Sequence, residues 1–208
     1  MDESQAVAII DDDPAILDSL RLSLTRKGFE VICFASARDF LVSVDTGLSL
    51  HCVVSDVKMP GMTGLMLQRL LAEKNALLPL IFITGHGDVD MAVSAVKAGA
   101  FDFIEKPIDD GRLATSIAEA INRHRSALAD QQEVASLRSR YKTLSDRQQQ
   151  VVALAVEGRS NKEIALQLGI SPRTVEHYRE SAMDRMQAAT FAQLVQMAVR
   201  LKVLPRAQ

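Results

Sequence analysis

The chain has 208 residues, of which 48% are hydrophobic and 24% are charged, and its formal net charge is −2. This composition is typical of a globular chain with one large or two small domains. Its apolar runs are far shorter than the roughly 20 residues of a membrane span. The opening MDESQ is acidic, unlike a signal peptide, so we expect a cytoplasmic protein without membrane contact.

The first 125 residues alternate between strand-like and helix-like segments. Strands are predicted at residues 6–10, 30–34, 52–56, 80–84 and 101–105, and a helix-like segment follows each of them. Three of these strands are apolar almost throughout, which indicates a parallel sheet covered by helices on both faces. We therefore expect an α/β doubly wound, five-stranded, flavodoxin-like fold, with its site at the carboxyl ends of the strands. Cys33 and Cys52 lie in these strands and are expected to be reduced core thiols.

Reactive side chains follow the predicted strands at this edge. These residues are Asp11 and Asp12 after the first strand, Asp56 after the third, Thr84 after the fourth and Lys106 after the fifth. No Gly-rich phosphate loop follows the first strand, which argues against a dinucleotide-binding enzyme.

Three carboxylates in one crevice repel each other unless a cation compensates them. Oxygen ligands without His or Cys favour Mg²⁺, which completes its shell with water and phosphate oxygens. With the Lys106 ammonium, the pocket would approach neutrality and could receive a phosphoryl group. Asp56 is then the candidate nucleophile, forming an acyl phosphate.

Four motifs, IIDDD, SDVKMPGMTG, FITGHGD and FIEKP, resemble in order and spacing the receiver domains of two-component response regulators. The resemblance covers roughly residues 4–125. It implies that Asp56 accepts phosphate from a sensor histidine kinase and that Asp12 ligates Mg²⁺ directly. Asp11 would support the metal largely through water, and Lys58 would contribute its backbone carbonyl.

The same resemblance implies a switch formed by Thr84 and Phe103, in which the threonine hydroxyl turns to the phosphoryl group and the ring follows. Ordinary strand packing is the alternative for Phe103. Lys106 would pair with the phosphate, beside a cis bond to Pro107. His86 is more often a solvated loop residue than one that tunes dephosphorylation. Phosphorylation would promote a homodimer through residues 93–103.

The helical pattern continues past the expected end of the receiver. Apolar residues recur on one face at Leu113, Ile117, Ile121, Leu128 and Leu137, and residues 126–142 contain no Gly or Pro. This pattern predicts a helical linker, because a flexible one would be rich in Gly or Ser. Its stripe could be a coiled-coil seam between two chains or could pack on its own domains.

Four short helices are predicted from residue 143 onward, with Ser145 and Gln148 as a capping box for the first. The second and third form a helix-turn-helix, whose recognition helix begins near Ser171 and Pro172. Its inner face is predicted from spacing to contain Val175, Tyr178, Ala182 and Met186. The opposite face would therefore meet DNA.

This region resembles the LuxR-type DNA-binding domain through LSDRQQQVV, EGRSNKEIALQLGIS, RTVEHYR and DRMQA. Receiver and LuxR-type domain together are typical of the FixJ/NarL class of regulators. The expected DNA-binding residues are Lys162, Arg173, Thr174, Glu176, His177, Arg179 and Glu180. The basic residues among them suit phosphates, whereas Glu176 and His177 could reach base edges. For each, a plain solvated position is the alternative.

The expected organisation is a receiver at 1–125, a linker at 126–142 and a DNA-binding domain at 143–208. Residues 142–208 carry 10 Lys and Arg against 6 Asp and Glu, whereas residues 1–141 carry 14 against 20. The basic excess suits a polyanion, although solvated surface would also explain it. The expected partners are the kinase, promoter DNA, RNA polymerase and a second copy of the chain.

Two other functions remain open. The tail could bind a protein partner instead of DNA, which a salt-sensitive duplex affinity would discriminate. A Mg²⁺-dependent phosphohydrolase would share the carboxylate pocket. It would also need a second catalytic aspartate near Asp56 and a cap over the substrate, and DVKMPG offers neither. We therefore expect a regulator that is not an enzyme, and its length resembles that of regulators of aromatic-compound breakdown.

Overall fold

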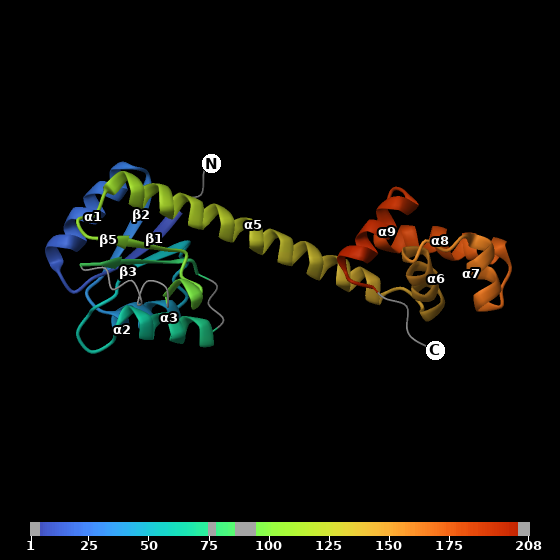
Figure 1. Ribbon diagram of the computed structural model, residues 1–208, viewed down its shortest axis with the longest axis horizontal. Helices are drawn as coiled ribbons and strands as arrows, with labels where there is room; N and C mark the ends of the chain where they lie inside the picture. Colours follow the sequence, from blue (N-terminus) through green and yellow to red (C-terminus); the bar gives the residue numbers. More distant parts are fainter. Residues whose placement is uncertain (1–4, 75–77, 86–94, 204–208) are drawn as a thin grey trace. The chain divides into compact units, whose positions relative to one another are not determined.

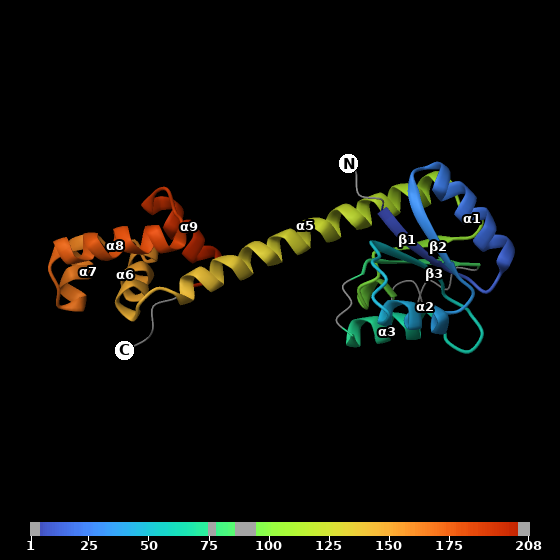
Figure 2. The same ribbon diagram turned by 180° about the vertical axis from the view of Figure 1, so that it is seen from behind.

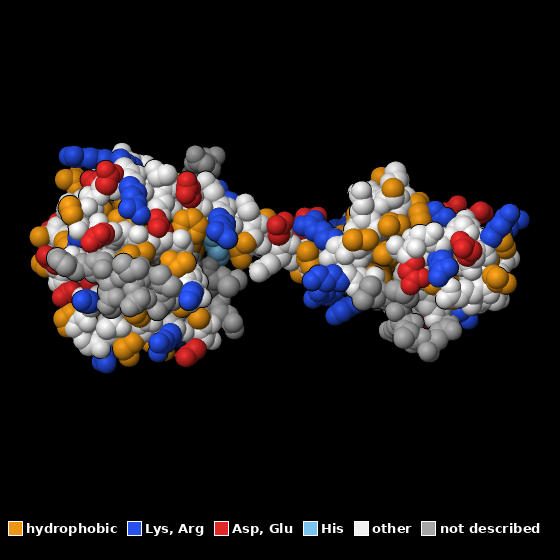
Figure 3. Space-filling view, viewed as in Figure 1, with side chains coloured by type: hydrophobic (Ala, Val, Ile, Leu, Met, Phe, Trp, Pro, Cys, Tyr) orange, Lys and Arg blue, Asp and Glu red, His pale blue; other side chains and the backbone are white. Residues whose placement is uncertain are grey.

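The computed structural model describes residues 5–74, 78–85 and 95–203. The chain forms two compact units, Met1–Ser126 and Ala127–Gln208 (Figure 1). On the face that Figure 3 shows, charged side chains of both signs are interspersed with hydrophobic ones over each unit. Within the part of the chain that is described, no helix is long and apolar enough to cross a membrane.

The first unit is built on one parallel sheet. Its strands are β1 (Gln5–Ile10), β2 (Phe29–Phe34), β3 (Cys52–Asp56), β4 (Leu80–Thr84) and β5 (Asp102–Glu105). They pair in the order β2-β1-β3-β4-β5, and every pair is parallel. The predicted doubly wound five-stranded sheet is confirmed. Because the strand order reverses at β1, the carboxyl ends of β1 and β3 flank the crevice where such folds build sites.

Helices cover both faces of this sheet (Figures 1 and 2). One face packs against α1 (Pro14–Arg26) and α5 (Asp110–Lys142), and the other against α2 (Ala37–Asp45) and α3 (Gly64–Glu73). Alternate residues of β1 serve the two layers, with Val7 and Ile9 in one core and Ala8 and Ile10 in the other. This alternation explains why a doubly covered strand is apolar throughout. The helix expected at residues 88–99 lies mostly outside the described residues.

The two cysteines lie in strands, as the sequence predicts. Cys52 is completely buried in β3, and this burial raises the pKa of its thiol to about 12. Cys33 in β2 is half-buried, and both thiols are free. A neutral thiol in the core is a poor nucleophile and metal ligand, so neither residue is a candidate site.

The second unit contains α6 (Asp146–Val156), α7 (Asn161–Leu168), α8 (Pro172–Met186) and α9 (Phe191–Arg200). The predicted capping box is present, because Gln148 N–H donates to Ser145 Oγ at 3.3 Å and Ser145 N–H donates to Gln148 Oε1 at 2.8 Å. A second box joins Ser160 and Glu163 at the start of α7. These local signals fix where the short helices begin.

A single helix, α5, contains both the last helix of the first unit and the predicted linker. No residue between Ile121 and Leu137 is buried. Leu137 packs in a core with Leu194 and Ala198 of α9. Arg200 of α9 also pairs with Asp130 at 3.1 Å and Glu133 at 2.6 Å on α5. The end of α5 therefore packs within the second unit, which favours the second of the two interpretations left open for its stripe.

Candidate functional site

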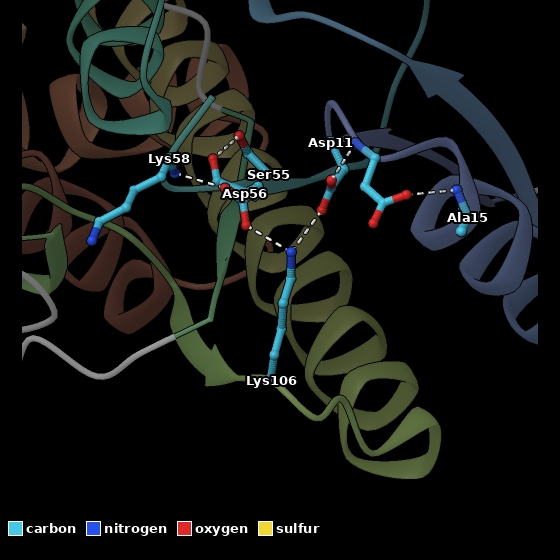
Figure 4. A network of polar contacts seen from close by, with 7 residues as sticks. Asp11, Ala15, Ser55, Asp56, Lys58 and Lys106 are labelled. Carbon is cyan, nitrogen blue, oxygen red and sulfur yellow. Dashed lines mark hydrogen bonds and ion pairs between the residues drawn. The ribbon is translucent and has the colours of Figure 1, made fainter. Parts of the chain in front are cut away.

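Three of the expected site residues meet at the carboxyl edge of the sheet. Asp11 follows β1, Asp56 ends β3 and Lys106 follows β5. The Lys106 ammonium donates to Asp11 Oδ2 at 3.0 Å and to Asp56 Oδ1 at 2.9 Å (Figure 4). One cation thus holds two carboxylates from separate strands at the switch point of the sheet.

Burial sets the electrostatics of this group. Asp11 and Asp56 are only 2% and 7% exposed. Burial raises the pKa of Asp11, although the Asp13 N–H and the Lys106 ammonium oppose the shift. Burial alone would lower the pKa of Lys106, but hydrogen bonds to Asp56 and Asp11 outweigh it and the pKa is raised. Lys106 is therefore firmly charged at neutral pH.

The backbone around Asp56 is held from several sides. Asp56 Oδ2 accepts a hydrogen bond from the Lys58 N–H at 2.7 Å, and the exposed Lys58 side chain extends away from the carboxylate (Figure 4). Ser55 Oγ donates to the Asp56 carbonyl at 2.9 Å. A Cβ on Gly64 would stand 2.4 Å from that carbonyl oxygen and 2.8 Å from the Phe82 ring. Gly64 is part of the motif quoted above, but only the folded chain reveals this close approach.

Asp12 differs in burial from Asp11 and Asp56. Its side chain is exposed, and Asp13 caps α1 by accepting from the Ala15 N–H at 2.9 Å. Within the ranges that the structure describes, no three His, Cys, Asp or Glu side chains are grouped closely enough to hold a metal. Two carboxylates and a backbone carbonyl still fit Mg²⁺, since this ion commonly uses one or two carboxylates and keeps several waters.

The expected switch residues lie beside this pocket. Thr84 ends β4 and is buried, whereas Phe103 in β5 is half-buried with its ring centroid 6.4 Å from that of Phe82. The expected cis bond between Lys106 and Pro107 is present. Thr84 and Lys106 therefore lie at the carboxyl ends of neighbouring strands, whereas Phe103 lies further back in β5, opposite Phe82. His86 and Val93 lie outside the described residues.

In the second unit, α7 and α8 form the expected helix-turn-helix, with Gly169 in a left-handed conformation at the end of α7. The predicted rotation of α8 is confirmed: Val175, Ala182 and Met186 are buried and Tyr178 is half-buried. The exposed candidates are Lys162 on α7 and Arg173, Glu176, His177 and Glu180 on α8. Thr174 is half-buried, and its Oγ1 lies 2.8 Å from Ser171 Oγ.

Arg179 is placed differently from the other basic candidates. Its side chain is half-buried and its Cζ lies 3.4 Å from the centroid of the Phe191 ring. It also donates to Asn161 Oδ1. The spacing of α8 suggested a cation facing outward, but spacing cannot reveal contacts with the first residues of two other helices.

Fold and site together define a class of protein: a phosphoryl-accepting receiver joined to a helix-turn-helix domain. Residues 7–118 match the response regulator receiver domain, and residues 142–198 match the luxR family of bacterial regulatory proteins. The chain belongs to the response regulators that combine these two domains, a class of transcription regulators controlled by phosphorylation. The sequence-based assignment to this family is confirmed.

Its relatives match over nearly their whole length. The transcriptional regulatory protein FixJ of Bradyrhizobium diazoefficiens is 42% identical over 198 residues, covering 95% of this chain and 96% of FixJ. The response regulator protein TodT of Pseudomonas putida is 39% identical over 201 residues, covering 97% of this chain and 88% of TodT.

Solved structures give the same result. The response regulator StyR has a TM-score of 0.80 at 34% identity, covering 95% of this chain and 99% of StyR. Full-length FixJ from B. japonicum has a TM-score of 0.61 at 42% identity, covering 96% of this chain and 98% of FixJ.

Proposed function

We propose that Asp56 is the phosphoryl acceptor of this response regulator and that a sensor histidine kinase is the donor. The observation that carries the proposal is the Lys106 ammonium held between Asp11 and Asp56 at 3.0 and 2.9 Å. An oxygen of Asp56 attacks phosphorus, the bond to the kinase imidazole breaks and an acyl phosphate forms. Lys106 then pairs with the phosphoryl oxygens.

Mg²⁺ is the cofactor of this step in our proposal. Asp11, Asp12 and Asp56 would hold it through carboxylates or water, and Lys58 through its backbone carbonyl. When bound, the ion offsets the negative charge that gathers on the transferring group. The two buried carboxylates support this assignment, because among the described residues the Lys106 ammonium is the one cation that pairs with them.

The acceptor assignment is tested by incubating the chain with Mg²⁺ and a radiolabelled small-molecule phosphoryl donor. Asp56→Asn should abolish labelling, and Asp12→Ala should raise the Mg²⁺ concentration required. Asp45→Asn is a matched control, because Asp45 is an exposed carboxylate paired with Lys74. Label that survives in Asp56→Asn would overturn the assignment.

We also propose how phosphorylation reaches the output. Thr84 and Phe103 would change the surface formed by residues 93–103, and this surface would then form a homodimer. Thr84 is buried at the end of β4, and Phe103 in β5 is half-buried against the core of one sheet face. Sedimentation with and without the phosphoryl donor measures the monomer fraction. An unchanged fraction would exclude this relay.

The DNA-binding role of the second unit is proposed to involve the exposed side chains of Lys162, Arg173, Glu176, His177 and Glu180, with half-buried Thr174 at the edge. Promoter DNA and RNA polymerase are the proposed partners, in the cytoplasm. The domains would be 1–125 and 143–208, joined by 126–142.

Lys162→Ala should weaken operator and random duplexes alike and lower the slope of log affinity against log salt by about 1. His177→Ala should cost roughly 1 to 3 kcal/mol on the operator and little on random DNA. The operator would come from selection out of a random pool. A tail that binds protein instead would have no salt-sensitive duplex affinity.

A further inference from the structure

Arg179 joins the first residues of two helices to the recognition helix. From α8, its guanidinium stacks on Phe191, the first residue of α9, and donates to Asn161, the first residue of α7. A planar guanidinium can stack through its face and donate through its edge at the same time, which a lysine ammonium cannot do. The side chain is therefore committed to contacts within its own unit.

Phe191, the residue on which Arg179 stacks, is held in place by the core of the second unit. Phe191 packs against both hydrophobic clusters of the second unit, one containing Met186 and Leu194 and the other Val151 and Val175. Its ring is therefore a fixed platform for the guanidinium. Burial lowers the pKa of Arg179, opposed by the charge of Glu176, yet an arginine remains protonated.

Asn161 is the residue between the cap of α7 and a proposed phosphate contact. Ser160 accepts from the Glu163 N–H at 3.3 Å, and Glu163 Oε2 accepts from the Ser160 N–H at 2.8 Å. Exposed Lys162 follows Asn161 directly in this first turn. A bond from Arg179 to Asn161 thus ties the turn that carries Lys162 to the helix that carries His177.

We infer that Arg179 is a positioning residue for DNA binding: it fixes the first turn of α7 relative to α8 and does not itself neutralise a DNA phosphate. The inference rests on the proposed use of α7 and α8 as the DNA-binding face. This role replaces the expectation that Arg179 contacts a DNA phosphate. Removal of Arg179 would weaken DNA binding because Lys162 and His177 would be displaced.

The test compares salt slopes for the full-length phosphorylated chain on selected operator and random duplexes. Arg179→Lys keeps the charge but loses the planar fork, and Phe191→Leu keeps Arg179 but removes its platform. Each should weaken operator binding roughly fivefold or more, as expected for groups in direct contact. Each should lower the slope by clearly less than 1, because Lys162 is displaced but keeps its charge near the duplex, and no phosphate contact of Arg179 itself is lost.

Matched controls separate the possible outcomes. Lys162→Ala should lower the slope by about 1. If the slope does not fall, Lys162 is not a phosphate contact. The role of Arg179 is judged separately, from the Arg179 and Phe191 variants. The double variant of Arg179→Lys and Phe191→Leu should bind about as well as either single variant, because both break one contact. Circular dichroism at the assay temperature verifies that each chain is folded.

Asn161→Ala provides a second route that leaves both Arg179 and Phe191 intact. It should weaken operator binding with a fall in slope clearly smaller than 1, as for the Arg179→Lys variant. In NMR spectra of the free wild-type chain, the Arg179 side-chain protons should be shifted upfield by the Phe191 ring and should keep that shift on DNA. Wild-type operator affinity in Arg179→Lys, or a slope lowered by about 1 in Arg179→Ala, would overturn the inference.

Discussion

At the scale of single residues, the pocket depends on one ammonium group shared by two buried carboxylates. The Asp11 and Asp56 side chains are 4% and 8% exposed, whereas that of Lys106 is 23% exposed. Removing one partner of a buried ion pair leaves uncompensated charge and is strongly destabilising. Repulsion between the two carboxylates would also favour the binding of a divalent cation in the pocket.

Lys106→Met should therefore lower the free energy of unfolding by about 3 kcal/mol in EDTA, and Mg²⁺ should restore much of the loss. Thermal unfolding with and without Mg²⁺ measures both effects. The control is Lys58→Met, because the exposed Lys58 side chain lies away from the carboxylates while its N–H still binds Asp56. Equal stability of the two variants in EDTA would contradict the shared-cation picture.

The half-buried His124 of α5 is expected to make the stability of the chain depend on pH. Burial lowers the pKa of His124 below its ordinary value of 6.5, and the charge of His51 lowers it further. Around pH 6, the unfolded chain then binds more protons at His124 than the folded chain does, and stability rises with pH.

The free energy of unfolding should therefore fall as the pH drops through 6.5 toward the lower pKa of folded His124. Urea unfolding on both sides of this range should reveal a smaller fall in His124→Gln than in the wild type. His177→Gln, at an exposed position of α8, should behave like the wild type. An identical fall in all three chains would rule out His124 as the source.

At the scale of elements, the junction of β3 and α3 is the tightest backbone approach at the site. Gly64 is the first residue of α3, and its N–H donates to the Val57 carbonyl at 3.0 Å. An alanine in a helix usually stabilises it relative to glycine. Here the added carbon would press on the Asp56 carbonyl at 2.4 Å, so crowding decides the sign.

Gly64→Ala should destabilise the chain by roughly 1 to 3 kcal/mol, the usual cost of overpacking. It should also slow labelling of Asp56, because relief of the clash must move that residue's backbone. Gly111→Ala is the control, since its nearest neighbour is the end of the Asp109 side chain at 3.1 Å. Denaturant unfolding and labelling rates measure both effects, and a stabilised Gly64→Ala would refute the argument.

Local sequence patterns predict the helices and strands better than they predict which side chains come together at a site. The apolar strands, the Ser145 cap and the buried face of α8 follow from periodicity and capping, and all are present. Asp11, Asp56 and Lys106 could be placed at one edge because parallel strands end together. The stacking of Arg179 could not be predicted, since the direction in which a side chain turns depends on neighbours distant in sequence.

At the scale of the whole molecule, each unit has its own core. Two hydrophobic clusters lie on either side of the sheet, and two smaller ones hold the helices of the second unit together. The carboxylate pocket lies within Met1–Ser126, and the helix-turn-helix within Ala127–Gln208. Signal reception and DNA recognition therefore depend on separately packed parts of one chain.

The bare middle of α5 has a practical consequence for handling this protein. Between Ile121 and Leu137 no side chain is fully buried. A helical stretch of this length with so little buried surface is only marginally stable in water. Transient fraying there exposes the backbone to a protease, so trypsin should cut after Arg123 or Arg125 before it attacks either core. Brief digestion followed by mass spectrometry should yield two resistant fragments, whereas early cuts within α8 would indicate that the second unit opens first.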